Sequence, residues 1–172
     1  LANLILGNKI LFFGLIIAEI ACVGYIAARI QKINAQTATA LFIGYSVLNG
    51  LTLSMIFLAY TASSIATTFF ITAATFGVMS IAGYVTKKDL STMGSYLMMG
   101  LIGVIIASVV NMFLHSETMD YIISYLGVFI FIGLTAYDTQ KIKTLGQEAI
   151  NNGASMQKIA ILGALTLYLD FV

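Results

Sequence analysis

The chain has 172 residues, of which 60% are hydrophobic and only 9% are charged, and its mean hydropathy is +1.00. A soluble domain carries about a quarter charged residues, so this composition predicts an integral membrane protein. Eight Lys and Arg residues against seven Asp and Glu residues leave no basic excess, which argues against a nucleic-acid-binding protein.

Six apolar stretches follow one another along the chain. They are too long, and alternate too little, for the strands of a membrane barrel. A helix needs about 20 apolar residues to cross ~30 Å of hydrocarbon. We therefore expect an all-α polytopic membrane helix bundle that forms a single domain over residues 1–172. Five complete spans are predicted at 10–29, 38–60, 64–85, 94–114 and 120–142, and a partial span at 157–172.

The first predicted span carries an acid near its centre and a base at its end. Glu19 stands where an ionised carboxylate is costly, so it is a candidate either for an ion pathway or for a buried hydrogen bond made by its protonated form. Arg29 ends the span. Its side chain either pairs with Asp138 and so latches the bundle, or only snorkels, with its charged group at the membrane interface.

The second predicted span has polar residues on one face. Asn49 shares that face with Tyr45 and Thr52, which makes it a candidate for an ion pathway, although such groups more often form hydrogen bonds between helices. Gly24 with Ala28, and Ser46 with Gly50, show the spacing of small residues that lets membrane helices pack closely. We expect packing at these positions.

Positive charge alternates between the connections, which predicts the orientation in the membrane. The connections YTASS and HSETMD contain no Lys or Arg. By the positive-inside rule, the other three connections are expected to be cytoplasmic. Their basic residues are Arg29, Lys32, Lys87, Lys88, Lys141, Lys143 and Lys158.

Two aspartates stand inside the last two apolar stretches. Charged groups at membrane depth normally face a bundle interior, a partner or water, so Asp138 and Asp170 are candidate functional residues. Thr135 lies three residues before Asp138, on the same helix face. Thr166 lies likewise four residues before Asp170. The alternatives are that Asp138 pairs with Lys141 at the interface and that Asp170 makes a purely structural hydrogen bond.

The depth of the two aspartates decides whether they meet. Asp138 precedes Lys141 by three residues, whereas Asp170 follows Lys158 by twelve, or ~18 Å of helix rise. Equal depth requires the fifth helix to continue past Lys141 or the sixth to begin after Lys158. The polar residues 146–155, GQEAINNGAS, predict a mobile connection between the two helices.

If the two aspartates do meet, they are expected to act as one unit. Two carboxylates at close range in a medium of low dielectric cannot both ionise cheaply, so the pair shares a proton. Its charge then changes with pH and can bias a helix arrangement that has two states. The sequence therefore predicts a pH sensor formed by Asp138 and Asp170.

No enzyme signature is present. With one histidine, His115, and one cysteine, Cys22, the chain offers no zinc-spaced cluster, and it has neither a nucleophile elbow nor a phosphate-binding glycine loop. Two membrane aspartates also occur in intramembrane proteases as YD and GLGD, but here the motifs are AYD at 136–138 and LYLD at 167–170. We expect a protein without catalysis and without a cofactor.

The two aspartate motifs resemble those of a known family. GLTAYDTQKIK at 133–143 and ALTLYLDFV at 164–172 resemble the signature of the transmembrane Bax inhibitor motif family, also called Bax inhibitor-1. KKDLS at 87–91 agrees with its layout, and the resemblance covers essentially the whole chain. It implies a seven-helix bundle with a central helix. We therefore expect the chain to be truncated at both ends, without the first helix and the rest of the last.

The resemblance also implies a function. It implies a pH-sensitive calcium leak in which Asp138 and Asp170 sense protons and an arginine near the position of Arg29 latches the closed state. A membrane glutamate of the family corresponds to Glu19.

The hypothesis that follows is a passive, pH-gated calcium leak in the cytoplasmic membrane of a bacterium. Carboxylate oxygens are ligands that calcium prefers. Its partners would be the lipid bilayer, calcium and protons. The rival hypotheses are a non-conducting interaction protein that regulates other membrane proteins or their turnover, and a proton-coupled exchanger. Candidates for the ion pathway are Glu19, Asn49, Thr135 and Thr166.

Overall fold

The computed structural model describes residues 9–29, 32–152 and 155–172, and nearly all of them are helical. No strand occurs among the described residues, which confirms the all-α prediction. The helices are α2 (Lys9–Arg29), α3 (Ala35–Leu53), α4 (Ile56–Ala59), α5 (Ala62–Val85), α6 (Ser91–Leu114), α7 (Glu117–Asn152) and α8 (Met156–Phe171).

Short polar side chains fix the start of two helices. At α3, Asn34 Oδ1 accepts a hydrogen bond of 2.7 Å from the backbone N–H of Thr37. At α5, Thr61 Oγ1 accepts one of 3.2 Å from the N–H of Ser64. Each side chain satisfies an amide that the first helical turn leaves without a partner, so these helices begin where the sequence provides a cap.

A break at Ser54 and Met55 separates α3 from α4. The chain has no proline, so the break has another cause. Ser54 Oγ donates a hydrogen bond of 2.6 Å to the carbonyl of Leu51, and a side chain that bonds the local backbone in this way competes with the regular helical pattern. The two helices still form one membrane crossing, Ala35–Ala59.

Four helical stretches among the described residues are long and apolar enough to cross a membrane, which confirms four of the five predicted complete spans. The first predicted span, 10–29, corresponds to the 21-residue helix α2, in which Gly14–Ile26 is a shorter apolar segment. The 16 residues of α8 agree with a partial span. The four crossings are Ala35–Ala59, Ala62–Val85, Ser91–Leu114 and Glu117–Asn151.

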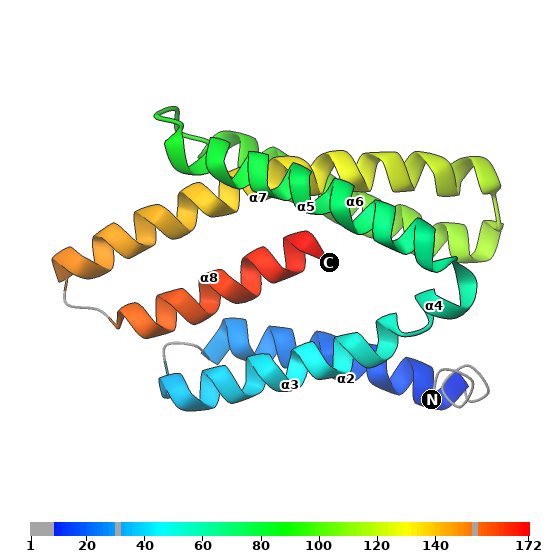
Figure 1. Cartoon of the computed structure of the whole chain (residues 1–172), viewed down its shortest axis with the longest axis horizontal. Helices are drawn as coiled ribbons and strands as arrows, with labels where there is room; N and C mark the ends of the chain where they lie inside the picture. Colours follow the sequence, from blue (N-terminus) through cyan, green and yellow to red (C-terminus); the bar gives the residue numbers. More distant parts are fainter. Residues whose placement is uncertain (1–8, 30–31, 153–154) are drawn as a thin grey trace.

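The helices form two groups with α8 between them (Figure 1). We call α5, α6 and α7 the α7 half, because α5 and α6 pack on α7. We call α2 and α3, which pack on each other, the α2–α3 half. Helix α8 contacts α7, α3 and α5, so it is the element that joins the two halves. A core between α2, α3 and α8 contains Ile26, Ala38, Tyr45 and Leu165.

Glycines serve the two halves differently. A Cβ atom at Gly83 of α5 would clash with the carbonyl oxygen of Ala136 in α7, so these two helices cross with their backbones in close contact. At Gly24 and Gly50, a Cβ atom would meet nothing within 4 Å in the described part of the chain. The close packing expected at these two glycines of α2 and α3 is therefore wrong.

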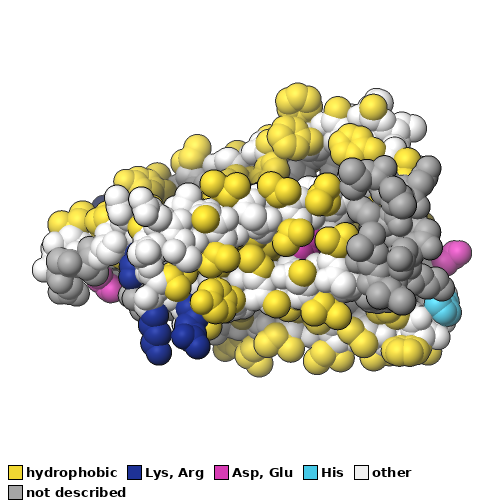
Figure 2. All heavy atoms as spheres, turned by 90° about the horizontal axis from the view of Figure 1, so that it is seen from below, with side chains coloured by type: hydrophobic (Ala, Val, Ile, Leu, Met, Phe, Trp, Pro, Cys, Tyr) yellow, Lys and Arg dark blue, Asp and Glu magenta, His cyan; other side chains and the backbone are white. Residues whose placement is uncertain are grey.

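The outer surface is suited to lipid. Figure 2 shows hydrophobic side chains spread along the bundle, with Lys and Arg side chains gathered toward one end and the histidine at the other. The end that carries the lysines of the α5–α6 connection and of α7 is called the basic end below. Exposed aromatic residues such as Phe70 and Phe129 would be costly in water and belong in hydrocarbon. The chain is an integral membrane protein.

Candidate functional site

Helix α7 is much longer than the sequence predicts. It runs without interruption from Glu117 to Asn152, so residues 146–152 are helical and the mobile connection expected at 146–155 is wrong for them. Residues 153 and 154 lie outside the described part. Ala149 is only 3% exposed, which shows that the helical extension is held by packing despite its polar sequence.

The extension places the two aspartates at equal depth. Asp138 lies fourteen residues before the end of α7 at Asn152, and Asp170 lies fourteen residues after the start of α8 at Met156. Because the two helices are antiparallel neighbours, both residues stand about 21 Å from the turn that joins them. Of the two arrangements that give equal depth, the structure forms the one in which the fifth helix continues past Lys141.

Both aspartates are half-buried, and they lie on the neighbouring helices α7 and α8. No hydrogen bond joins the two carboxyl groups in the residues that the structure describes. The Oδ2 atom of Asp170 is buried and has no hydrogen-bond partner among them. A buried carboxyl oxygen without a partner is rare, because its desolvation is then not compensated.

The hydroxyl groups predicted beside the aspartates bond to their own helices. Thr135 Oγ1 donates to the carbonyl of Phe131 at 2.8 Å, and Thr166 Oγ1 donates to that of Leu162 at 3.0 Å. Neither hydroxyl donates to an aspartate in the described structure. Thr135 is nevertheless 3% exposed, so a polar residue is buried one turn from Asp138.

A cavity of about 460 Å³ opens beside the end of α8. Its walls come from α5, α6, α7 and α8 and are mostly apolar, with Phe76, Met79 and Phe131 among them. Asp170 and Thr135 are polar residues of its lining, whereas Asp138 is not part of it. The cavity therefore reaches the pair through Asp170.

Glu19 and Asn49 belong to a second polar cluster, between α2 and α3. Thr52 Oγ1 donates to Glu19 Oε1 at 2.5 Å, which joins the two helices. Asn49 Nδ2 donates to the hydroxyl of Tyr45 at 2.8 Å within α3. The edge of the Tyr168 ring of α8 packs against Tyr45 at 5.9 Å between ring centres, so α8 touches this cluster with one residue and the aspartate site with another.

Arg29 ends α2 and its side chain is exposed. In the described part of the chain it forms no ion pair with Asp138. The latch therefore stays a prediction.

Sequence reasoning missed two residues that hold connections together. Asn111 is 5% exposed, and its side chain bonds both the N–H and the carbonyl of Ser116 at 3.1 Å and the carboxylate of Asp120 at 2.5 Å. Gln140 of α7 holds the α5–α6 connection. A buried amide near a helix end signals such a role, but its partners are not readable from sequence.

Comparisons with known proteins agree on the class of molecule. The family model described as inhibitor of apoptosis-promoting Bax1 matches residues 1–172. The inner membrane protein YbhL of Escherichia coli K12 is 52% identical over 171 residues, which cover 99% of this chain and 73% of YbhL. An uncharacterised protein of Borreliella burgdorferi is 48% identical over 169 residues, which cover 98% of this chain and 73% of the relative. No solved structure matches the chain significantly.

Proposed function

The chain belongs to the Bax inhibitor-1 family, and on that basis we propose that it is a pH-sensitive passive calcium leak of the bacterial cytoplasmic membrane. The name of its Escherichia coli relative, an inner membrane protein, supports this location. The proposal assigns the protein no catalysis and no cofactor. In it the basic connections face the cytoplasm.

The buried Asp170 oxygen without a partner carries the proposal. A carboxyl group that only stabilised the bundle would be expected to bond its neighbours, as Glu19 bonds Thr52. Asp170 instead faces an apolar cavity, with Asp138 at the same depth on the next helix. Two such carboxyl groups gain or lose a proton as a unit, and the change in charge alters their repulsion.

Calcium is the permeant ion that the acids favour. It is bound by hard oxygen ligands, and carboxylates supply them. We propose that the ion passes Asp170 and Asp138, with Thr135 and Thr166 beside them and Glu19 and Asn49 on the facing half. In the closed state Arg29 pairs with Asp138.

Calcium flux into proteoliposomes tests the proposal. The wild-type protein should admit calcium at a rate that depends on pH, and Asp138→Asn and Asp170→Asn should remove that dependence. Glu148→Gln is the matched control, because it removes an acid from an exposed part of the same α7 helix. Flux that keeps its pH profile in both Asn variants would refute the mechanism.

The alternative function is that of a non-conducting protein that regulates other membrane proteins. The Glu19–Thr52 hydrogen bond favours it, because a satisfied membrane acid can serve stability alone. Wild-type liposomes that do not leak calcium at any pH would support this alternative. Flux driven by an imposed proton gradient, and absent without one, would instead indicate proton-coupled exchange.

A further inference from the structure

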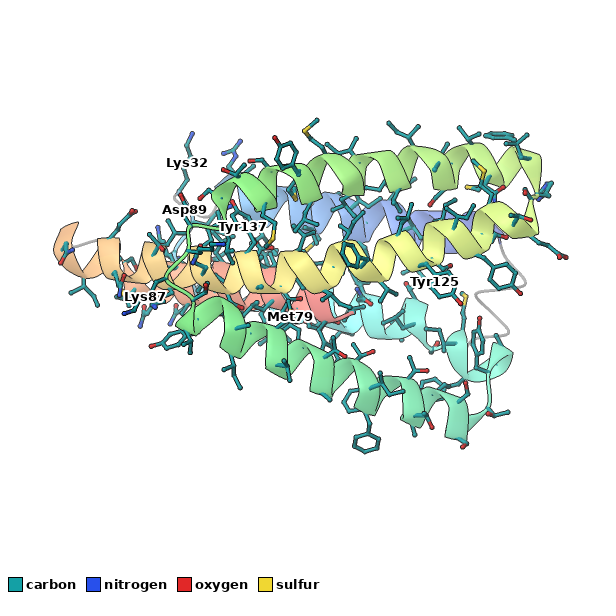
Figure 3. The ribbon with its side chains drawn as sticks, turned by 90° about the horizontal axis from the view of Figure 1, so that it is seen from above. Lys32, Met79, Lys87, Asp89, Tyr125 and Tyr137 are labelled. Atoms are coloured by element: carbon teal, nitrogen blue, oxygen red, sulfur yellow. The ribbon has the colours of Figure 1, made fainter. Side chains whose placement is uncertain are left out.

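A second cavity, of about 470 Å³, lies at the basic end of the bundle, and none of its lining residues is shared with the Asp170 cavity. Its walls come from the α5–α6 connection, the first residue of α6 and residues 137–147 of α7. Figure 3 shows Lys87, Asp89 and Tyr137 near one another where this connection passes α7. The charged residues of the lining are the lysines Lys87, Lys141 and Lys143 and the acid Asp89. The lining therefore has a net positive charge.

The single acid of the lining is engaged at a helix start. Asp89 Oδ1 accepts a hydrogen bond of 2.9 Å from the N–H of Ser91, the first residue of α6. The positive end of the helix dipole favours a carboxylate at this place. Among the described residues, Asp89 forms no ion pair with a lysine of the cavity. The carboxylate of Asp89 is thus held at the helix start and leaves the ammonium groups of Lys87 and Lys141 available for an anion.

Two residues of α7 hold the cavity in shape. Gln140 Oε1 accepts a hydrogen bond from the N–H of Leu90 at 2.9 Å, and its Nε2 donates to the carbonyl of Lys88 at 2.8 Å. Lys143 Nζ donates to the carbonyl of Tyr84 at 2.7 Å and lies 4.7 Å from the centre of the Tyr84 ring. These contacts fix the connection against α7, so a ligand would not have to order it.

The cavity lies at the depth of lipid headgroups. Asp120, in the first turn of α7, and Gln140 are twenty residues apart, which corresponds to about 30 Å of helix rise. This distance equals the thickness of the hydrocarbon, so the two residues stand at opposite interfaces. Tyr84 and Tyr137 lie at the same level as Gln140, where tyrosine is enriched in membrane proteins.

Exposed apolar side chains of α5 directly precede the connection that lines the cavity. On α5, Ile81 is 66% exposed and Val85 is 65% exposed, and both precede the connection by less than two turns. A free anion would gain nothing from these side chains, whereas the acyl chains of a lipid can pack along them. The position therefore favours an anion that carries apolar tails.

We propose that this cavity binds the phosphate of an anionic glycerophospholipid, with the lysine ammonium groups around the phosphate and the acyl chains along α5. Basic pockets between membrane helices are known to receive such headgroups. This lipid site is independent of the calcium leak, because its lining contains neither Asp138 nor Asp170.

Native mass spectrometry of the full chain, titrated with dioleoylphosphatidylglycerol, tests the proposal. The variant Lys87→Gln/Lys141→Gln removes two charges from the cavity and keeps Lys143, which supports the fold. The matched control, Lys32→Gln/Lys88→Gln, removes two charges from exposed connections outside the cavity lining. We expect the cavity variant to bind the lipid at least about ten-fold more weakly than the control.

Three outcomes would overturn the proposal. Lipid binding that is weakened equally in the two variants would mean that the lysines attract lipid only through the net charge of the protein. Equal binding of dioleoylphosphatidylcholine by the wild-type protein would mean that the anionic headgroup is not recognised. Full displacement of the lipid by inorganic phosphate at millimolar concentration would assign the cavity to a free anion.

Discussion

The α7 half and the α2–α3 half of the bundle bring their helices together by different means. In the α7 half, helices cross where glycine allows contact. Gly83 meets the backbone of Ala136, and a Cβ atom at Gly94 of α6 would lie 2.5 Å from the ring of Tyr137. In the α2–α3 half, polar side chains join the helices, through the Thr52–Glu19 hydrogen bond and a contact of 3.7 Å from Cys22 Sγ to the carbonyl of Leu41.

This difference separates a rigid region from an adaptable one. The backbones of α5 and α7 are in close contact and α6 packs on the Tyr137 ring, so we expect these three helices to keep one geometry. Hydrogen bonds between side chains can exchange partners at little cost, and a carboxyl group can also change its protonation state. We expect α2 and α3 to move relative to α7, with α8 between them.

The largest expected effect comes from filling the α5–α7 crossing. Gly83→Leu places a side chain where the carbonyl of Ala136 lies, so we expect a loss of about 3 kcal/mol or more in the free energy of unfolding. Unfolding in sodium dodecyl sulfate, followed by circular dichroism, measures it. Gly24→Leu is the control, because its side chain meets open space. Equal losses in the two variants would contradict the distinction between the halves.

A smaller effect is expected from the polar contact of the other half. Thr52→Val keeps the shape of the side chain but removes the hydroxyl that donates to Glu19, so the free energy of unfolding should fall by about 1 kcal/mol. The same unfolding measurement applies. Thr52→Ser, which retains the hydroxyl, should behave like the wild type. A loss in Thr52→Val as large as that in Gly83→Leu would show that both halves are equally rigid.

The smallest effect is expected at an exposed acid of the α7 half. Interactions with the hydroxyl and the N–H of Ser91 hold the pKa of Asp89 below its ordinary value. A lowered pKa in the folded state stabilises the protein above the ordinary pKa, and this stabilisation is lost as the pH falls through the folded value. In Asp89→Asn, the free energy of unfolding should therefore depend slightly less on pH in the acid range than it does in the wild type. An unchanged profile would mean that this cap contributes nothing.

Much of the fold follows from the sequence, because hydrophobic length is a local property. The apolar stretches of α3, α5 and α6 are of this kind. The end of α7 is not, because GQEAINN has the composition of a loop and only packing of residues such as Ala149 makes it helical.

The candidate site, too, is predictable only where local properties of the sequence decide its structure. The cost of a charge in hydrocarbon identifies Asp138 and Asp170 from sequence alone. Their equal depth depends on where α7 ends, which is a tertiary effect. Gln140 could not be predicted, because its partners at Lys88 and Leu90 lie about fifty residues away in sequence.

The length of α7 also makes the protein sensitive to hydrophobic mismatch. Asp138 stands about 27 Å of helix rise from Asp120, so in an average hydrocarbon layer of ~30 Å it lies close to one face of that layer. A bilayer thicker than the span thins around it or draws its polar ends inward. Lipids with longer acyl chains should therefore strip water from Asp138, and shorter ones should hydrate it. In the proposed pH sensor, the thickness of the membrane would thus act on the same acid as pH.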